Sequence, residues 1–210
     1  MLVSTGDVRT WIGVKEADTN PNQKIQDLIY SIEGFVNDYT NRAVEARTYD
    51  GDQEFSYLDG KGNRWLYLPQ YPISNISDLR IDSDREFGSA SAVSADDFYF
   101  YPNGKVVIEA GNFTQGRRNI KATYVAGFAP VRGGTHNAAV STYPCPRDLS
   151  QAIVEMVALS FNEGATLIHN ITDENENTIR FQQVLSKNSF IKRVLDKYVR
   201  YDAGFEFLGE

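Results

Sequence analysis

The hydrophobic positions of the chain follow two different periods. Near the N-terminus, apolar residues recur at spacings of three and four, which places them on one face of a helix. They are Ile25, Leu28, Ile29, Ile32, Phe35, Val36 and Tyr39. We expect Asn20 as the N-cap, Pro21 in the first turn, Gln23 closing a capping box, and an end near residues 40–42. A shorter helix is predicted from Ser4 or Thr5 to Gly13.

From about residue 46 to residue 126 the pattern changes to short β-type runs separated by turn residues. The predicted strands are 46–49, 54–58, 64–68, 76–81, 98–101, 105–109 and 120–126. Asn103-Gly104 between two β-rich runs predicts a tight hairpin, because both residues tolerate positive φ. No helix-length segment separates the runs, which favours antiparallel pairing.

The rest of the chain returns to the helical period. After the last strand and a polar loop at 131–142, Pro146 opens a helix that closes at Gly164, and a final helix is predicted over 189–200. The apolar stripe of the first of these helices consists of Leu149, Ile153, Met156, Val157 and Phe161. That of the final helix consists of Ile191, Val194, Leu195 and Tyr198. Segments 83–95 and 170–178 are polar and are expected to be exposed loops.

The fold class expected from this pattern is α+β: a helical bundle with an inserted antiparallel β-rich block and a C-terminal tail. The expected organisation is N-terminal helices at 1–43, the β block at 44–130, a loop at 131–145, C-terminal helices packing on the N-terminal ones at 146–200, and an extended tail at 201–210.

Charge is unevenly distributed in this chain of net charge −7. Residues 179–200 hold 6 Lys/Arg against 1 Asp/Glu, while the last ten residues hold 3 acids and no base. The remaining acidic body disfavours binding to nucleic-acid phosphates, which requires Lys and Arg. No apolar run approaches a membrane span, and the N-terminus lacks the pattern of a signal peptide, so no membrane association is expected.

Candidate chemistry is sparse. The single cysteine, Cys145, excludes an intramolecular disulfide. The calcium-loop-like run at 173–177 has Thr178 in place of the turn glycine and Val184 in place of the bidentate glutamate. Gly60-x-Gly62 precedes a strand and is expected to be a turn. We therefore expect no catalytic residue, no cofactor and no metal.

Two histidines, His136 and His169, fall in expected loops. A hydrolase that pairs Cys145 with His136 stays open as a less favoured alternative, as does one with a carboxylate site.

Aromatic residues form the remaining signal. Phe98, Tyr99, Phe100 and Tyr101 alternate across both faces of a strand, and Tyr67 and Tyr71 could join them. Ordinary sheet packing explains this pattern, but aromatic side chains are also enriched at interfaces. Phe98, Phe100, Tyr67 and Tyr71 are therefore the candidates for a subunit interface. The alternative function is a carbohydrate- or host-surface-binding module built on this β block.

The order of these elements resembles the head–tail connector (adaptor, or head-completion) proteins of tailed bacteriophages. The segments that carry the resemblance are 28–42, 65–73, 97–101, 103–107, 120–128, 146–153 and 194–200. The chain departs from the shorter form of the family in its long loops at 83–95, 131–143 and 164–178, which leaves the specificity for partners open.

The resemblance implies a structural virion protein without catalytic activity. Such proteins form a ring, typically twelve-fold, under the portal protein after DNA packaging. The ring extends the DNA channel and is the platform for a downstream neck or tail-completion protein. DNA passes without specific binding. The expected location is the head–tail interface of the virion, and the host cytoplasm during assembly.

The C-terminal tail is predicted to bind a neighbouring protein, the portal in the arrangement that the resemblance implies, because its apolar residues lie beyond the last expected helix with no local core to join. The residues expected to make this contact are Arg200, Tyr201, Phe205, Phe207 and Leu208.

Overall fold

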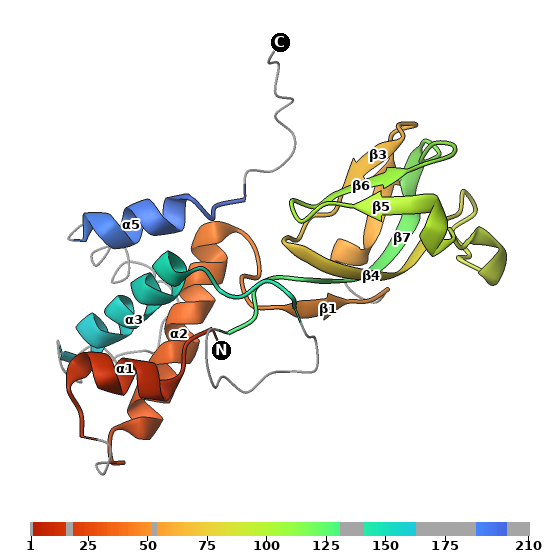
Figure 1. Ribbon diagram of the computed structural model, residues 1–210. Helices are drawn as coiled ribbons and strands as arrows, with labels where there is room; N and C mark the ends of the chain where they lie inside the picture. The colour runs from red at the N-terminus through yellow and green to blue at the C-terminus, as the bar shows by residue number, and fades with distance from the viewer. Residues whose placement is uncertain (1, 16–18, 52–53, 131–140, 163–187, 201–210) are drawn as a thin grey trace. The chain divides into compact units, whose positions relative to one another are not determined.

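The computed structural model describes residues 2–15, 19–51, 54–130, 141–162 and 188–200, and these form two compact units (Figure 1). The helical unit consists of Met1–Val44, Pro130–Thr135 and Cys145–Glu210. The β unit consists of Glu45–Ala129 and His136–Pro144. In the sequence, the β unit is thus inserted between the N-terminal and the C-terminal helices of the helical unit.

Four helices are described in the helical unit: α1 (Thr5–Ile12), α2 (Asn22–Thr40), α3 (Arg147–Asn162) and α5 (Ser189–Asp196). The Oγ of Ser4 accepts the N–H of Asp7, whose carboxylate accepts the N–H of Ser4, so α1 begins with a capping box. It ends at Gly13, whose φ of 73° is left-handed. The start and end predicted for this helix are confirmed.

The N-terminus of α2 differs from the prediction. Pro21 is the N-cap, without a side-chain capping bond, and the helix begins at Asn22. The expected capping box of Asn20 and Gln23 is therefore wrong. The reason is a backbone turn: the N–H of Asn22 donates to the carbonyl of Thr19 at 3.1 Å. The Oδ1 of Asn22 instead accepts Arg9 Nη1 of α1 at 2.6 Å.

The predicted apolar stripes of the helices form the core of the helical unit. On α2, Ile25, Leu28, Ile29, Ile32 and Val36 are buried, whereas Phe35 and Tyr39 are half-buried. The stripes of α3 and α5 also include fully covered residues: Leu149, Ile153, Met156, Val157, Ile191, Val194 and Leu195. The hydrophobic period alone therefore identified the buried faces of α2, α3 and α5.

The final helix is shorter than predicted. It ends at Asp196, and the N–H groups of Lys197 and Tyr198 bond three residues back, to Val194 and Leu195. The N–H of Arg200 then donates to the carbonyl of Thr40 at 2.7 Å. A helix continued to residue 200 would not place this N–H against the end of α2, because its own turn would take it.

The β unit contains two antiparallel sheets (Figure 1). In the larger sheet, β7 (Gly116–Ala126) is the central strand. It pairs with β4 (Ile73–Ile81) and, on its other edge, with β1 (Arg47–Tyr49) and β2 (Tyr57–Gly60). The smaller sheet has the order β3 (Trp65–Tyr67), β6 (Lys105–Ile108), β5 (Phe98–Phe100).

Three strand predictions need correction. Residues Glu54–Ser56 form a 3₁₀ turn, so the strand predicted over 54–58 begins only at Tyr57. β4 begins at Ile73, three residues before the predicted start. β7 begins at Gly116 rather than 120, because Gly60 of β2 pairs with Gly116 and extends the ladder through polar residues. Pairing partners, which periodicity does not reveal, set these bounds.

The hairpin at Asn103-Gly104 is confirmed. Tyr101 donates its N–H to the carbonyl of Lys105 at 2.8 Å, and Gly104 has a φ of 93°. The segment 83–95 is mostly exposed, as expected. At its end, however, Val93 donates its N–H to the carbonyl of Leu79 and packs against the core.

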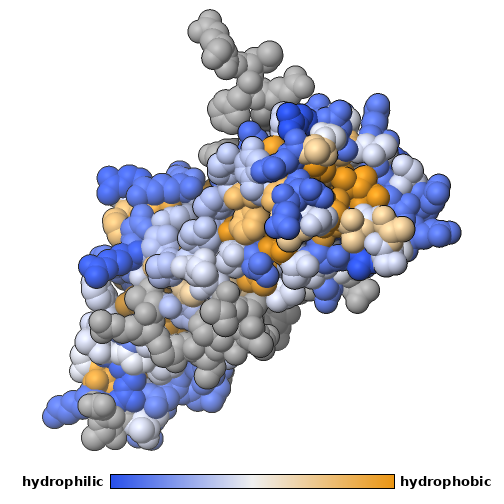
Figure 2. All heavy atoms as spheres, turned by 45° about the vertical axis from the view of Figure 1, so that its right-hand side comes forward, coloured by the Kyte–Doolittle hydropathy of each residue, from blue (hydrophilic) through white to orange (hydrophobic). Residues whose placement is uncertain are grey.

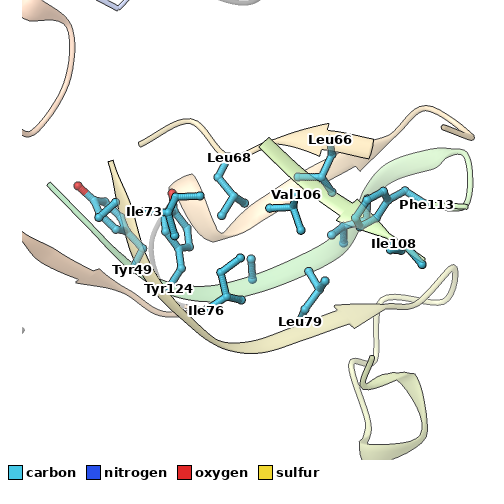
Figure 3. Close-up of a cluster of buried hydrophobic side chains, with 13 residues drawn as sticks. Tyr49, Leu66, Leu68, Ile73, Ile76, Leu79, Val106, Ile108, Phe113 and Tyr124 are labelled. Atoms are coloured by element: carbon cyan, nitrogen blue, oxygen red, sulfur yellow. The ribbon is translucent and has the colours of Figure 1, made fainter. Parts of the chain in front are cut away.

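The core of the β unit lies between its two sheets. Leu66 and Val106 of the smaller sheet point toward Ile76 and Leu79 of the larger one (Figure 3). The ring of Tyr124 stacks on that of Tyr49 with centroids 5.0 Å apart. Six hydrophobic side chains against this core are only partly buried: Phe55, Leu58, Ile81, Val93, Phe98 and Phe100. Figure 2 shows hydrophobic residues reaching the surface of this unit.

Candidate interaction surfaces

The outer face of the smaller sheet is rich in exposed aromatic rings. Trp65 and Tyr67 project from β3, and Tyr99 and Tyr101 from β5 and the residue after it; each ring side chain is 43–45% exposed. Between them, Lys105 and Val107 of β6 are half-buried. We call these six residues the aromatic face.

Strand register places the aromatic face in two rows. Trp65 and Tyr99 both pair with Val107, and Tyr67 pairs with Lys105, whose carbonyl accepts the N–H of Tyr101. Along each edge strand the two rings meet edge to face: Trp65 with Tyr67, and Tyr99 with Tyr101, with 5.6 Å between centroids in both pairs. The two rings of each pair therefore restrict one another on the outer side of the sheet.

Charged groups accompany the rings. Lys105 Nζ lies 5.8 Å from the centroid of Trp65, within cation–π range. The pKa of Tyr99 is raised, first by desolvation and then by the neighbouring Tyr101 and Glu109, while Arg64 opposes the shift. Arg64 Nη2 also donates to the carbonyl of Glu109. Glu109 and Arg64 thus lie at the end of the face next to Tyr99.

The predicted interface residues do not all belong to this face. Tyr67 does. Phe98 and Phe100 project to the opposite side of β5, where they pack against the core and are half-buried. Tyr71 is half-buried in the segment after β3. A subunit interface at these four residues stays a prediction. The exposed partners Trp65, Tyr99 and Tyr101 were not among the candidates, although the alternation along 98–101 was a signal for Tyr99 and Tyr101.

A second feature is a polar anchor at the C-terminal end of the helical unit. The carboxylate of Asp148, in the first turn of α3, accepts Lys197 Nζ at 2.9 Å and the hydroxyl of Tyr198 at 2.7 Å. Tyr39 donates its hydroxyl to the carboxylate of Asp196 at 2.5 Å. Together with the bond from Arg200 to Thr40, these contacts tie the last described residues to α2 and α3.

The anchor perturbs the ionisation of its members. Desolvation by burial tends to raise the pKa of Asp148, but the hydrogen bonds from Lys197 and Tyr198 outweigh it, so the pKa lies below 3.8. Burial, and then the Asp148 carboxylate, raise the pKa of the Tyr198 hydroxyl. The pair is therefore held as carboxylate and neutral phenol at neutral pH. The tail residues Tyr201, Phe205, Phe207 and Leu208 lie outside the described residues.

The candidate catalytic thiol is unsuited to nucleophilic attack. Cys145 is 4% exposed, and burial, with the carboxylates of Glu33 and Asp148 nearby, raises its pKa to about 12. A thiol with such a pKa supplies little thiolate at neutral pH. His136 and His169 lie outside the described residues, so a pairing of Cys145 with His136 is untested.

The other sequence motifs give no site within the described residues. Gly60 ends β2, and Gly62 has a φ of 78° in the following turn, as predicted. The run 173–177 lies outside the described residues. The described part of the chain contains no cluster of three or more potential metal-ligating side chains and no helix long and apolar enough to cross a membrane.

Three solved structures share this fold over nearly the whole chain. They come from the neck of an empty GTA particle, the virion of a native gene transfer agent (GTA) particle, and the neck of a native GTA particle. Identities are 14%, 17% and 15%, and TM-scores are 0.58, 0.56 and 0.56. Each match covers 97% of this chain and 92–93% of the other. No curated protein matches.

The family model described as head completion protein matches residues 1–200. The chain therefore belongs to the head completion protein family and is a structural head–tail connector protein of the virion.

Proposed function

We propose that the protein assembles under the portal protein as a ring, the twelve-fold ring that typifies connectors. There it extends the DNA channel and is the platform for the next neck or tail component. The observation that carries this proposal is the family match over residues 1–200. The fold shared with a protein of a GTA neck whose structure was computed with C12 symmetry supports the ring.

We propose that this role involves no catalysis. The family description is structural, and the one cysteine of the chain is buried with a raised pKa. Activity of the ring therefore rests on binding and shape alone.

Electron microscopy tests the ring directly. The purified protein is imaged alone and mixed with its portal protein. Rings that sit coaxially on the portal are expected in the mixture. A mixture in which the protein stays monomeric and unbound would contradict the proposal.

The DNA channel is proposed to repel rather than bind its cargo. The chain has a net charge of −7, and an acidic or neutral lumen neutralises few phosphates, so DNA can slide. A ring map should therefore show a lumen lined by acidic or neutral residues. A continuous Lys/Arg-lined channel would rule this out.

The contact with the portal is assigned to the tail. The anchor at Asp148 and Thr40 holds Arg200, the last residue before this tail, on the helical unit. Tyr201, Phe205, Phe207 and Leu208 would supply the apolar contacts. Ordering such a segment costs roughly 1–2 kcal/mol per residue, so several anchors are needed.

Removing the tail tests this contact. Deletion of residues 201–210 should abolish portal binding measured by calorimetry, while helical content stays unchanged. A variant with Phe205, Phe207 and Leu208 replaced by serine keeps the length and charge of the tail and should lose most of the affinity. Unchanged portal binding by either variant would refute this role.

Contacts between neighbouring subunits of the ring are assigned to aromatic residues of the β unit. Tyr67 is available on the exposed face, and Tyr71, Phe98 and Phe100 retain partly exposed rings. Replacing Tyr67 and Tyr71 together by serine should reduce ring formation without loss of the fold.

A further inference from the structure

The aromatic face exposes more ring surface than a solvated sheet requires. Trp65, Tyr67, Tyr99 and Tyr101 are each nearly half exposed and lie in two rows across three strands. Contiguous exposed patches of this kind mark binding sites. The other side of this sheet already packs on the core of the β unit. The core therefore does not require aromatic rings on the outer side.

The two ends of this face carry opposite charges. Lys105 lies in the row with Tyr67 and Tyr101, and its long side chain extends the ammonium toward Trp65 of the other row. At the other end, exposed Glu109 follows β6 beyond the row of Trp65 and Tyr99, and its N–H donates to the carbonyl of exposed Asp97 at 2.9 Å. Arg64 also lies at this end, but its Nη2 donates to the carbonyls of Ile108 and Glu109. The acidic end therefore keeps a net negative charge.

A partner that fits must bring apolar rings at its centre and the same two charges in reversed order. A second copy of the aromatic face, rotated by 180° about an axis through its middle, has this arrangement. We infer that the aromatic face is a self-association surface that joins two copies of the free protein face to face. Lys105 of each copy then meets Glu109 of the partner subunit, and the rings pack on rings.

The size of the face sets the strength of this contact. With 150–250 Å² per aromatic side chain and slightly less than half of it exposed, the four rings offer roughly 300–450 Å². A stable interface buries about 800 Å² on each partner. The contact is therefore smaller than a stable interface, and the dimer is expected to be weak.

This inference does not depend on the ring. A twofold contact closes at two copies, whereas a ring needs two different surfaces on each subunit. Tyr67 belongs both to this face and to the proposed ring contacts, so the test leaves it unchanged. Ring formation on the portal, scored by microscopy, can fail while the free protein still dimerises, and the reverse also holds.

Sedimentation equilibrium of the full chain tests the contact through charge reversal. Lys105→Glu and Glu109→Lys should each weaken self-association at least about tenfold, because each brings like charges together across the twofold axis. An equimolar mixture of the two variants should recover association, since Glu at 105 then meets Lys at 109. Loss of association in both single variants and its recovery in their mixture together require position 105 of one copy to meet position 109 of the other.

Two further variants complete the test. Tyr99→Ser with Tyr101→Ser should remove association, and Tyr30→Ser, at a still more exposed tyrosine on α2, should not change it. Circular dichroism confirms that each variant folds. A wild-type protein that stays monomeric up to about 1 mM, association unaffected by the Lys105 change, or a mixture without recovery would each overturn the inference.

Discussion

The contacts that stabilise the helical unit internally differ in kind from those that stabilise the β unit internally. In the helical unit, ionisable side chains join segments far apart in the sequence: Glu33 accepts the N–H of Leu2, and Asp148 accepts Lys197 and Tyr198. In the β unit, segments far apart in the sequence are joined mainly by backbone ladders and by close approaches of one backbone to another. Gly127, with a φ of 109°, has no room for a Cβ, which would lie 2.5 Å from the carbonyl oxygen of Glu45.

This difference predicts different sensitivities. The helical unit should respond to pH, because protonation removes its hydrogen-bond acceptors. The β unit should respond mainly to changes in backbone geometry and in the volume of its aromatic core, because most of its long-range pairing is made by strand ladders, with few contacts such as that of the Asp59 carboxylate to the N–H of Arg118. Each unit has its own core, so a change in one should leave the other folded.

The largest effect is expected at Tyr124. Its ring is fully buried and stacked on Tyr49, so Tyr124→Ala should destabilise the β unit by about 3–5 kcal/mol. Hydrogen exchange should show lost protection in β4 and β7 and unchanged protection in α2 and α3. Ile153→Ala, in the core of α3, is the matched change and should give the reverse pattern. Equal loss in both units would mean that the units unfold as one.

Gly127→Ala should have the next largest effect, about 2–3 kcal/mol, because the added Cβ meets the backbone of Glu45 and Ala46. Gly111→Ala is the control: its φ of 99° is also unfavourable for alanine, but nothing lies within 4 Å. Chemical denaturation of both variants separates the cost of a positive φ in alanine from the cost of the steric clash of the added Cβ. If Gly127→Ala costs no more than Gly111→Ala, the close approach does not stabilise this fold.

The smallest effect concerns Asp148. Asp148→Asn should destabilise the helical unit by about 1 kcal/mol at pH 7, because an amide is a weaker acceptor for Lys197. The folded-state pKa is lowered, so the carboxylate stabilises the fold above its ordinary value of 3.8 and loses this contribution as the pH falls below it.

Thermal unfolding across this pH range is the measurement for Asp148. The difference between wild type and Asp148→Asn should shrink below about pH 4. Asp27→Asn, on the exposed side of α2, should behave as wild type throughout. A difference that does not depend on pH would assign the effect of Asp148→Asn to packing.

Sequence patterns were most informative where one element decides its own structure. The stripe Ile25–Val36 predicted the buried face of α2, and Asn103-Gly104 predicted its hairpin, because both signals are local. The capping box at Asn20 failed because a backbone turn from Thr19 to Asn22 moves the start of α2 to Asn22 and leaves Pro21 as the N-cap. The strand predicted at 54–58 failed because its first three residues have no partner strand.

The same limit applies to the candidate interface. Alternation along 98–101 predicted that two aromatic residues would face outward, but not which two. Phe98 and Phe100 turn inward because β5 pairs with β6 in a register that aligns them with Ile108 and Val106, which are buried. Trp65 then lies in the same row as Tyr99 only because β3 pairs with the other edge of β6.

The sequence by itself determined the α+β class, the apolar faces of the helices, the hairpin and the family to which the chain belongs, since each depends on residues near one another or on their order. The tertiary structure decided which aromatic rings are exposed, where the strands end and how Asp148 anchors the C-terminal segment. These features arise from pairings between residues far apart in the sequence, such as Asp148 with Tyr198 and Arg47 with Ala126, and no local period encodes such a pairing.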